Sequence, residues 1–373
     1  MGGLGSAVLI VLGAAIVACI LFDVFQSVVV PRSTSRLLRL SSTLVTLVWP
    51  CWRAVGHRMR PVSRREDFLS VFAPLFLAVF LVAWVVCLVL GYGMMLWGLG
   101  HQIRPVVSDL GSACYLAGTA LFTLGFGDMV GSGAAARFVL LLDASSGLAV
   151  VALVISFLFT LHGSFQRREV LVLTLDDPAG APPSGVTLLE TYARLGMQGD
   201  LALTFRAWEA WCAEVLESHR ASPLLPFFRS GHADESWVSA LGAVLDAATL
   251  VLTVLEDGPK GPAHFTRSLG VHTVLDLQSI FGLPREEYAL VSPPEFREAY
   301  CRLRQAGYPL VAEERAWEAF AAARREYAGP LNELARYFAI PAAQWVGDRS
   351  ILPHQRHATA ADGAGSGHAS HTH

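Results

Sequence analysis

Charge is scarce in this chain, and lysine is almost absent. Charged residues make up 16% of the 373 positions, Lys260 is the only lysine, and 53% of the residues are hydrophobic. This composition excludes an ordinary soluble globular protein and favours a membrane protein. There is also no basic stripe interleaved with aromatic residues, so the sequence does not predict nucleic acid as a partner.

Motifs for catalysis, metals and nucleotides are missing as well. The six cysteines are widely spaced and form no CxxC pair, so neither a disulfide framework nor a zinc site is predicted. No activated nucleophile, paired carboxylates or metal-ligand constellation stands out, and the sequence therefore predicts neither an enzyme nor a bound cofactor. No GxGxxG motif follows a strand-like segment, which argues against a Rossmann-type nucleotide-binding domain.

The first long apolar run predicts a transmembrane helix. It extends over 24 residues from Ala7 to Val30 with Asp23 as its only charge, enough to cross a hydrocarbon core of about 30 Å. No basic residue precedes the run, so it does not resemble a signal peptide. Eight arginines lie between residues 31 and 67, which predicts a cytoplasmic segment and an N-terminus outside.

Residues 1–67 thus form the first predicted part of the chain, a transmembrane helix followed by a basic cytoplasmic segment. The uncharged stretch from Leu40 to Trp52 carries apolar residues at helical spacing but is too short to span a bilayer. It predicts an interfacial helix that is broken near Pro50. Asp23 lies near the inner end of the first span, where Arg32 or Arg36 is its predicted partner.

Two further spans are predicted, with a short apolar stretch between them. Phe68 to Gly100 is 33 residues without a formal charge, and Phe138 to His162 is 25 residues with Asp143 as its only charge. Gly111 to Phe122 is only 12 residues long, so it can enter the membrane but not cross it, and we expect a re-entrant helix. Two arginines soon after the last span agree with a cytoplasmic exit.

A six-residue motif stands between the short helix and the last span: Thr123-Leu124-Gly125-Phe126-Gly127-Asp128. It resembles the selectivity filter of the potassium channel family, in which backbone carbonyl oxygens replace the hydration shell of the ion. Stacked carbonyls require alternating backbone twists, which glycine tolerates and other L-residues dislike. Gly125 and Gly127 supply this freedom, and Thr123 adds a hydroxyl ring at the inner end. Leu124 and Phe126 are expected to point backwards and wedge the loop against the pore helix.

The resemblance covers about residues 68–165 and implies roles for further positions. Tyr115 lies where the family often has a pore-helix aromatic, Asp128 stands at the outer mouth, and Gly147 occupies the position of the gating hinge. Each also has a plain structural interpretation, as an interfacial aromatic, a loop residue and a close-packing glycine. By the family's register, the cavity-lining residues are Leu148, Val151, Ile155 and Phe159.

Two features depart from the usual pattern of the family. Phe126 replaces the more common tyrosine, so no phenolic hydroxyl ties the filter to the pore helix; phenylalanine occurs there in some members, and selectivity is still expected. Ala120 and Phe122 stand where threonines are frequent, which leaves Thr119 as the polar residue behind the filter.

An acid inside a membrane span is costly and is therefore a functional candidate. Asp143 lies five residues before Leu148, roughly 140° around the helix. It is therefore expected to point away from the permeation path, and a hydrogen-bonded structural role is favoured over a functional one.

One filter segment supplies only one wall of a pore, because an ion on an axis needs oxygens from several sides. The chain has no second filter-like repeat. The resemblance therefore implies a homotetramer with K⁺ as the permeant ion. The pore helices would then direct their negative C-terminal ends to a central cavity, which favours a cation there.

The rest of the chain is predicted to be cytoplasmic and mainly helical. Residues 166–186 contain a strand-like piece at 170–175 and a Pro- and Gly-rich stretch, and predict a linker. Residues 187–353 predict a helical domain that regulates or assembles the pore, with no motif that identifies a ligand. Residues 354–373 hold five histidines among small residues and predict a disordered tail. The helical patterns cover 187–219, 234–257, 262–282, 293–306 and 311–338.

The densest polar and aromatic group of this region comprises His219, Arg229, His232, Asp234 and Trp237. One interpretation is a ligand-binding or pH-sensing site. The other is structural, with Asp234 as a helix N-cap, Trp237 in the core and the histidines in loops.

Together these features predict an all-α membrane protein with three transmembrane helices, a re-entrant pore helix with its filter, and a helical cytoplasmic domain. The predicted function is a potassium-selective channel of the cell membrane, with membrane lipid and further copies of the chain as partners. Two alternatives stay open: a poorly selective cation channel, and a non-conducting receptor or scaffold with a vestigial pore. An intact filter argues against the scaffold.

Overall fold

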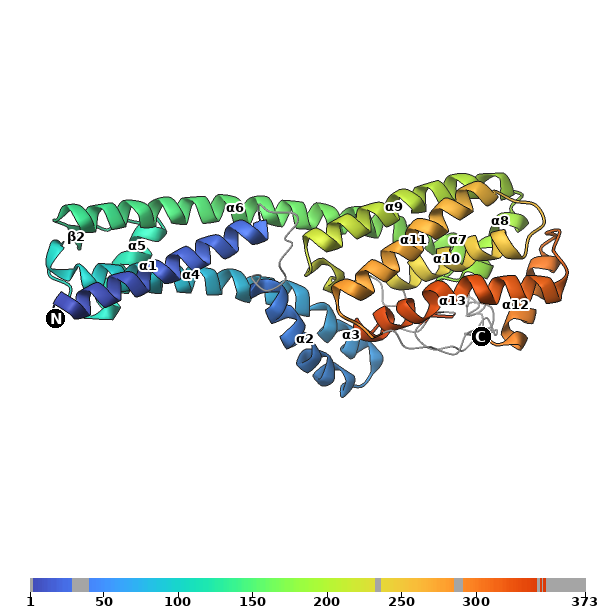
Figure 1. Cartoon of the computed structure of the whole chain (residues 1–373), viewed down its shortest axis with the longest axis horizontal. Coiled ribbons are helices and arrows are strands. Elements are labelled where there is room, and N and C mark those ends of the chain that lie inside the picture. Colours follow the sequence, from blue (N-terminus) through green and yellow to red (C-terminus); the bar gives the residue numbers. More distant parts are fainter. Residues whose placement is uncertain are drawn as a thin grey trace, which may run out of the picture. The chain divides into compact units, whose positions relative to one another are not determined.

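The computed structural model describes residues 3–28, 40–231, 236–284, 291–340, 343, 345 and 346, and these are mainly helical (Figure 1). In this part of the chain three helices are long and apolar enough to cross a membrane. They are α1 (Gly3–Val28), α4 (Phe72–Gly98) and α6 (Ala134–Leu173). The all-α fold and the three predicted spans are confirmed.

The chain divides into two compact units. The first comprises Met1–Leu171, Trp211–Ala233 and Ser279–Phe281, and the second comprises Val172–Ala210, Asp234–Gln278 and Gly282–His373. Residues 211–231 therefore belong with the membrane spans, although the sequence predicted a helical domain over 187–353.

In the first unit α1 packs along α4 through small residues (Figure 1). A Cβ atom added to Gly13 would overlap the carbonyl oxygen of Gly91, and one added to Gly98 would lie 2.9 Å from the carbonyl oxygen of Ser6. Close approach of backbones at small residues is typical of membrane helices, because lipid offers no hydrophobic force to hold them together. The two helices therefore form one tightly packed pair.

Asp23 is buried on the same pair of helices. Its carboxylate accepts a hydrogen bond of 2.8 Å from the indole nitrogen of Trp84 in α4. The predicted partners Arg32 and Arg36 lie outside the described residues.

The basic segment folds into α2 (Leu40–His57) and α3 (Val62–Ser70). α2 runs through Pro50 without ending, so the predicted break is wrong. Proline removes one backbone hydrogen bond of a helix, but aromatic packing holds the helix on both sides of Pro50. The Trp49 ring lies 4.9 Å from that of Phe72, and the Trp52 ring stacks on Phe68 at 4.4 Å.

The stretch 166–186, predicted as a linker, contains the boundary between the two units after Leu171, but it is largely helical. α6 continues to Leu173, where the sequence suggested a strand-like piece, and α7 (Asp176–Ala179) follows almost directly. Residues 183–186 are buried. Proline and glycine content reports local preference only, and here apolar burial outweighs it.

The second unit is a helical bundle around α10 (Trp237–Thr253), whose residues are nearly all buried. It packs against α8 (Gly185–Arg194) and α13 (Glu313–Tyr337). The helix predicted over 187–219 is two helices, because Gly196 takes a left-handed φ of +69° after α8 and the turn η3 (Gln198–Asp200) follows. The unit also contains α12 (Pro293–Gln305), α9 (Leu201–Ala221) as far as Ala210, and α11 (Lys260–Ile280) as far as Gln278.

A buried ion pair lies in the core of this bundle. Arg324 Nε donates to Asp246 Oδ1 at 2.8 Å, and the Tyr327 hydroxyl donates to the same oxygen at 2.7 Å. Arg324 also donates to the carbonyl oxygen of Trp345 at 2.7 Å. Burial raises the pKa of Asp246, and the opposite charge of Arg324 counteracts the rise. Each charge depends on the other, because both side chains are almost fully buried.

Replacing Asp246 by alanine leaves the Arg324 guanidinium buried without its counter-ion. We expect a loss of about 3–5 kcal/mol in the free energy of unfolding, measured as a lower thermal midpoint of the purified chain. The control is Glu326→Ala, which removes the exposed partner of Arg267 and should cost less than about 1 kcal/mol. If the double variant Asp246→Leu/Arg324→Leu regains stability, the loss comes from the unpaired charge of Arg324. Equal thermal midpoints for Asp246→Ala and Glu326→Ala would contradict the prediction.

Candidate functional site

The predicted re-entrant helix is α5 (Leu110–Leu121). Asp109 caps its N-terminus by accepting hydrogen bonds from the Ser112 amide at 2.9 Å and the Ser112 hydroxyl at 2.8 Å. These bonds lower the pKa of the Asp109 carboxyl below its ordinary value. α5 packs closely on α4, since a Cβ atom on Gly93 would lie 2.6 Å from Cys114 Sγ. The short helix is therefore fixed at its start and along its side.

The filter segment has an alternating backbone. Thr123, Gly125 and Gly127 have φ angles of +55°, +56° and +80°, while Leu124 and Phe126 between them do not have positive φ. The positive φ predicted for the two glycines is confirmed. The positive φ of Thr123 was not predicted; this conformation costs an L-residue about 1–2 kcal/mol.

Backbone amides tie the start of the filter to the end of α5. The Leu124 and Gly125 amides donate to the Thr119 carbonyl oxygen at 2.8 and 3.3 Å, and the Thr123 amide donates to the Ala120 carbonyl oxygen at 2.9 Å. By contrast, the carbonyl oxygens of residues 123–127 accept no hydrogen bond from any described residue. The loop thus has anchored donors and five successive acceptors that are available to a cation or to water.

The outer end of the filter is tied to the end of α4. The strand β1 (Ile103–Arg104) pairs antiparallel with β2 (Val130–Gly131), directly after the filter. The Gln102 carbonyl oxygen also accepts a hydrogen bond from the Ser132 amide at 2.7 Å. Between these points the side chains of Tyr115 in α5 and Asp128 lie near each other. The filter is therefore held at both ends.

The side chains of the filter are largely exposed in the single chain: Leu124 is 57% exposed and Phe126 is 67% exposed. The wedge expected between them and α5 stays a prediction. The four predicted cavity residues are likewise exposed and share one face of α6: Leu148, Val151, Ile155 and Phe159.

Gly147 and Asp143 lie on the packed side of α6. A Cβ atom on Gly147 would overlap the Leu121 carbonyl oxygen at the end of α5, which favours the close-packing interpretation of this glycine. Asp143 is fully buried and so does not share the exposed face of Leu148. The predicted hydrogen-bonded role is wrong, because neither carboxylate oxygen has a hydrogen-bond partner among the described residues.

Sequence reasoning used Arg168 only as a topology marker and missed its contacts. Arg168 lies near the end of α6 and is 2% exposed. Its guanidinium contacts Phe228 O at 2.6 Å, Glu169 Oε1 at 2.8 Å, Leu225 O at 3.2 Å and His219 Nε2 at 3.5 Å. The Arg168 carbonyl oxygen accepts from the indole nitrogen of Trp211 at 3.0 Å. A buried arginine held by backbone carbonyls fixes the end of α6.

Residues 221–229, here called the anchor segment, connect this arginine to the basic segment. The anchor segment contains the turn η4 (Leu225–Phe227). The Phe227 ring packs 5.1 Å from Trp49 of α2 and 5.5 Å from Phe72 of α4. Arg229 forms an ion pair with Glu66 of α3. The same short stretch thus binds the end of α6 and packs on the helices before α4.

The polar group predicted between residues 219 and 237 is not one site. His219 is buried beside Arg168 in the first unit, whereas Trp237 lies in the core of the second unit with its ring 5.9 Å from Phe338. The N-cap of α10 is Ser236, whose hydroxyl accepts from the Val238 amide at 3.2 Å, and not Asp234 as predicted. His232 and Asp234 lie outside the described residues.

Comparison with known proteins bears on the broad class of the chain. It is 22% identical over 257 residues to an uncharacterized membrane protein, YdjJ, of Bacillus subtilis (strain 168), covering 66% of this chain and 72% of that protein. The chain is a membrane protein. Its three long apolar helices agree with a multi-pass arrangement. No protein-family model matches it, and no solved structure matches it.

Gly147→Ala tests the packing between α6 and α5. The added methyl group overlaps the Leu121 carbonyl oxygen, so we expect a loss of about 1–3 kcal/mol and a lower thermal midpoint in detergent. Gly163→Ala is the matched control, because the same methyl on the same helix would lie 3.5 Å from the nearest atom, Arg167 Nη1. A Gly147→Ala protein as stable as the control would favour the hinge interpretation.

His219 should make stability depend on pH. Burial, with a contribution from Arg168, lowers the pKa of His219 well below its ordinary value of 6.5. The unfolded chain therefore binds more protons just below that pH, and stability should fall as the pH drops from about 6.5. Thermal midpoints between pH 7.5 and 5 check this: His219→Gln should weaken the dependence, while the exposed His272→Gln should retain it. An unaltered pH profile in His219→Gln would contradict the prediction.

Proposed function

We propose that this chain is the subunit of a homotetrameric, potassium-selective channel. The observation that carries the proposal is the alternation of backbone handedness at Thr123, Gly125 and Gly127. It leaves five successive carbonyl oxygens without hydrogen-bond partners among the described residues. A cation that sheds its water requires such oxygens at successive levels. K⁺ is the ion, by resemblance of the motif to the potassium channel filter.

Four copies around one axis would complete the pore. The exposed Leu124 and Phe126 side chains then fill the space between one filter and the neighbouring subunit. The exposed face of α6 that carries Leu148 and Phe159 lines the cavity below the filter. The C-terminal end of α5 faces this cavity, where its dipole favours a cation.

The proposed topology places the N-terminus and the filter outside and the arginine-rich α2 and α3 inside, at the cell membrane. The anchor segment then lies at the cytoplasmic end of α6, where its carbonyl groups hold Arg168. Movement of this segment would move the inner end of the pore-lining helix. Regulation by the cytoplasmic helices is proposed to act through this contact.

Gly125→Ala is the decisive variant. A Cβ atom there meets nothing within 4 Å, so the cost comes only from its φ of +56°, about 1–2 kcal/mol in each subunit. We expect at least a tenfold loss of K⁺ flux or of K⁺ over Na⁺ selectivity in liposomes, with the tetramer intact on sizing. Gly199→Ala, also in open space but without positive φ, should leave both unchanged.

The same measurements separate the alternatives. Equal reversal potentials for Na⁺ and K⁺ in the wild-type protein would indicate a poorly selective cation channel. An intact oligomer without flux would indicate a receptor or scaffold. Wild-type selectivity in Gly125→Ala would overturn the filter assignment.

A further inference from the structure

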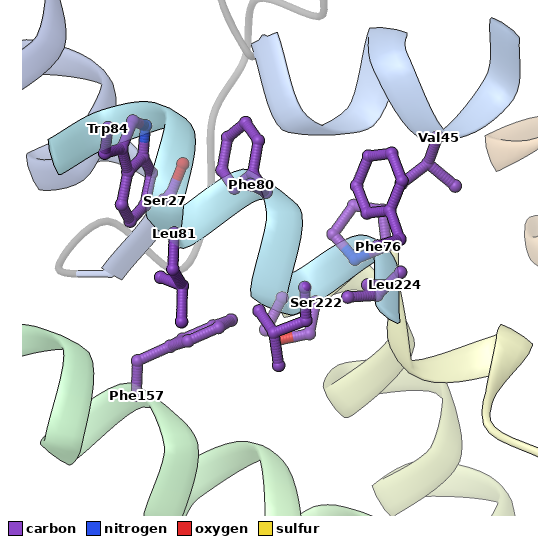
Figure 2. A pocket seen from close by; sticks show the side chains of 12 residues that line it. Ser27, Val45, Phe76, Phe80, Leu81, Trp84, Phe157, Ser222 and Leu224 are labelled. Atoms are coloured by element: carbon purple, nitrogen blue, oxygen red, sulfur yellow. The ribbon is translucent and has the colours of Figure 1, made fainter. Parts of the chain in front are cut away.

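A cleft of about 540 Å³, its open mouth included, lies beside the first half of α4. Figure 2 shows Phe76, Phe80 and Trp84 along α4, and Phe157 on α6. Val45 of α2 and residues of the anchor segment complete the wall. The other lining residues are Ser27, Leu77, Leu81, Ala221, Ser222, Pro223 and Leu224.

The lining matches a hydrocarbon chain. Apart from the indole of Trp84, its polar side chains are two serines, Ser27 and Ser222, and the Trp84 nitrogen already donates to Asp23. The rings of Phe80 and Trp84 lie 4.7 Å apart, and those of Phe76 and Phe80 stack at 6.1 Å, forming a rigid apolar wall. Because α4 and α6 are long and apolar enough to cross a membrane, lipid acyl chains are available to this cleft.

Charge next to the cleft points to an anionic headgroup. Over α2 and α3, residues 40–70, the chain carries five arginines and two acids, Glu66 and Asp67, so the segment is net positive. α2 contributes Val45 to the cleft, and Arg53 lies eight residues further along the same helix, about 12 Å away. Polybasic segments beside a membrane attract anionic lipids.

We propose that this cleft binds one acyl chain of an anionic phospholipid, whose headgroup lies at the arginines of α2 and α3. The acyl chain would contact Phe157 of α6 and Leu224 of the anchor segment. The next residue, Leu225, supplies a carbonyl group to Arg168. The bound lipid thereby stabilises the contact between the anchor segment and α6. Its effect on ion flux rests on the proposed function, whereas its binding does not.

The test measures binding first. The full-length protein is incubated with dioleoyl phosphatidylglycerol or dioleoyl phosphatidylcholine, and bound lipid is counted by native mass spectrometry. We expect at least tenfold more phosphatidylglycerol bound. Leu81→Trp and Ser222→Trp each fill the cleft and should lower this binding at least tenfold. Val79→Trp is the control, because Val79 is 60% exposed on the same helix and outside the cleft.

A diazirine-bearing phosphatidylglycerol probe locates the site, and crosslinks should fall within residues 76–84 or 221–224. Equal binding of the two lipids, unchanged binding in both filling variants, or crosslinks only elsewhere would overturn the proposal. The last two results are those expected if a second copy or another segment of this chain occupies the cleft.

Flux is then compared in vesicles with and without phosphatidylglycerol. The lipid should raise K⁺ flux at least threefold in the wild type and Val79→Trp, but not in the filling variants. If phosphatidylglycerol binds specifically but does not change K⁺ flux, only the proposed effect of the lipid on flux is overturned. Specific binding with no flux under any condition would overturn the proposed function and leave the lipid site standing.

Discussion

The carbonyl oxygen of Thr119 sets the geometry of the filter. The last carbonyl groups of an α-helix lack partners within the helix, and in α5 this one accepts the amides of Leu124 and Gly125. The chain must therefore turn back over the end of α5 before it continues. Gly93 and Gly147 bring α4 and α6 close to α5. The position of the filter therefore depends on glycines in α4 and α6 as well as on its own.

Arg168 fixes the C-terminal end of α6, the end away from the filter. Its guanidinium reaches carbonyl groups of two residues in the anchor segment and the carboxylate of Glu169 at once. A planar group with five donors can do this, whereas a lysine ammonium is a compact point charge. Arg229 pairs with Glu66 in the same region. Arginine therefore suits this contact better than lysine, because its planar group fixes the orientation of the hydrogen bonds as well as supplying a charge.

The spans and the re-entrant helix could be predicted because length and lack of charge decide whether a segment crosses a bilayer. The positive φ of Gly125 and Gly127 could be predicted because few other residues accept it. The role of Arg168 could not, because its partners are backbone carbonyl groups 57 and 60 residues away, which no side-chain pattern reveals. The same holds for Asp246 and Arg324, separated by 78 residues. The helix through Pro50 depends on aromatic partners distant in sequence, such as Phe227.

The exposed surfaces of the single chain suggest an order of biogenesis. The apolar face of α6 around Leu148 and Ile155 is compatible with lipid, because acyl chains are as apolar as leucine. The carbonyl groups of residues 123–127 are not, since hydrocarbon offers them no donor. In the proposed channel, helices can insert as separate subunits, but the carbonyl groups of each filter need contact with water at this stage. Closing the ring of subunits is then the step at which the carbonyl groups exchange bulk water for ions.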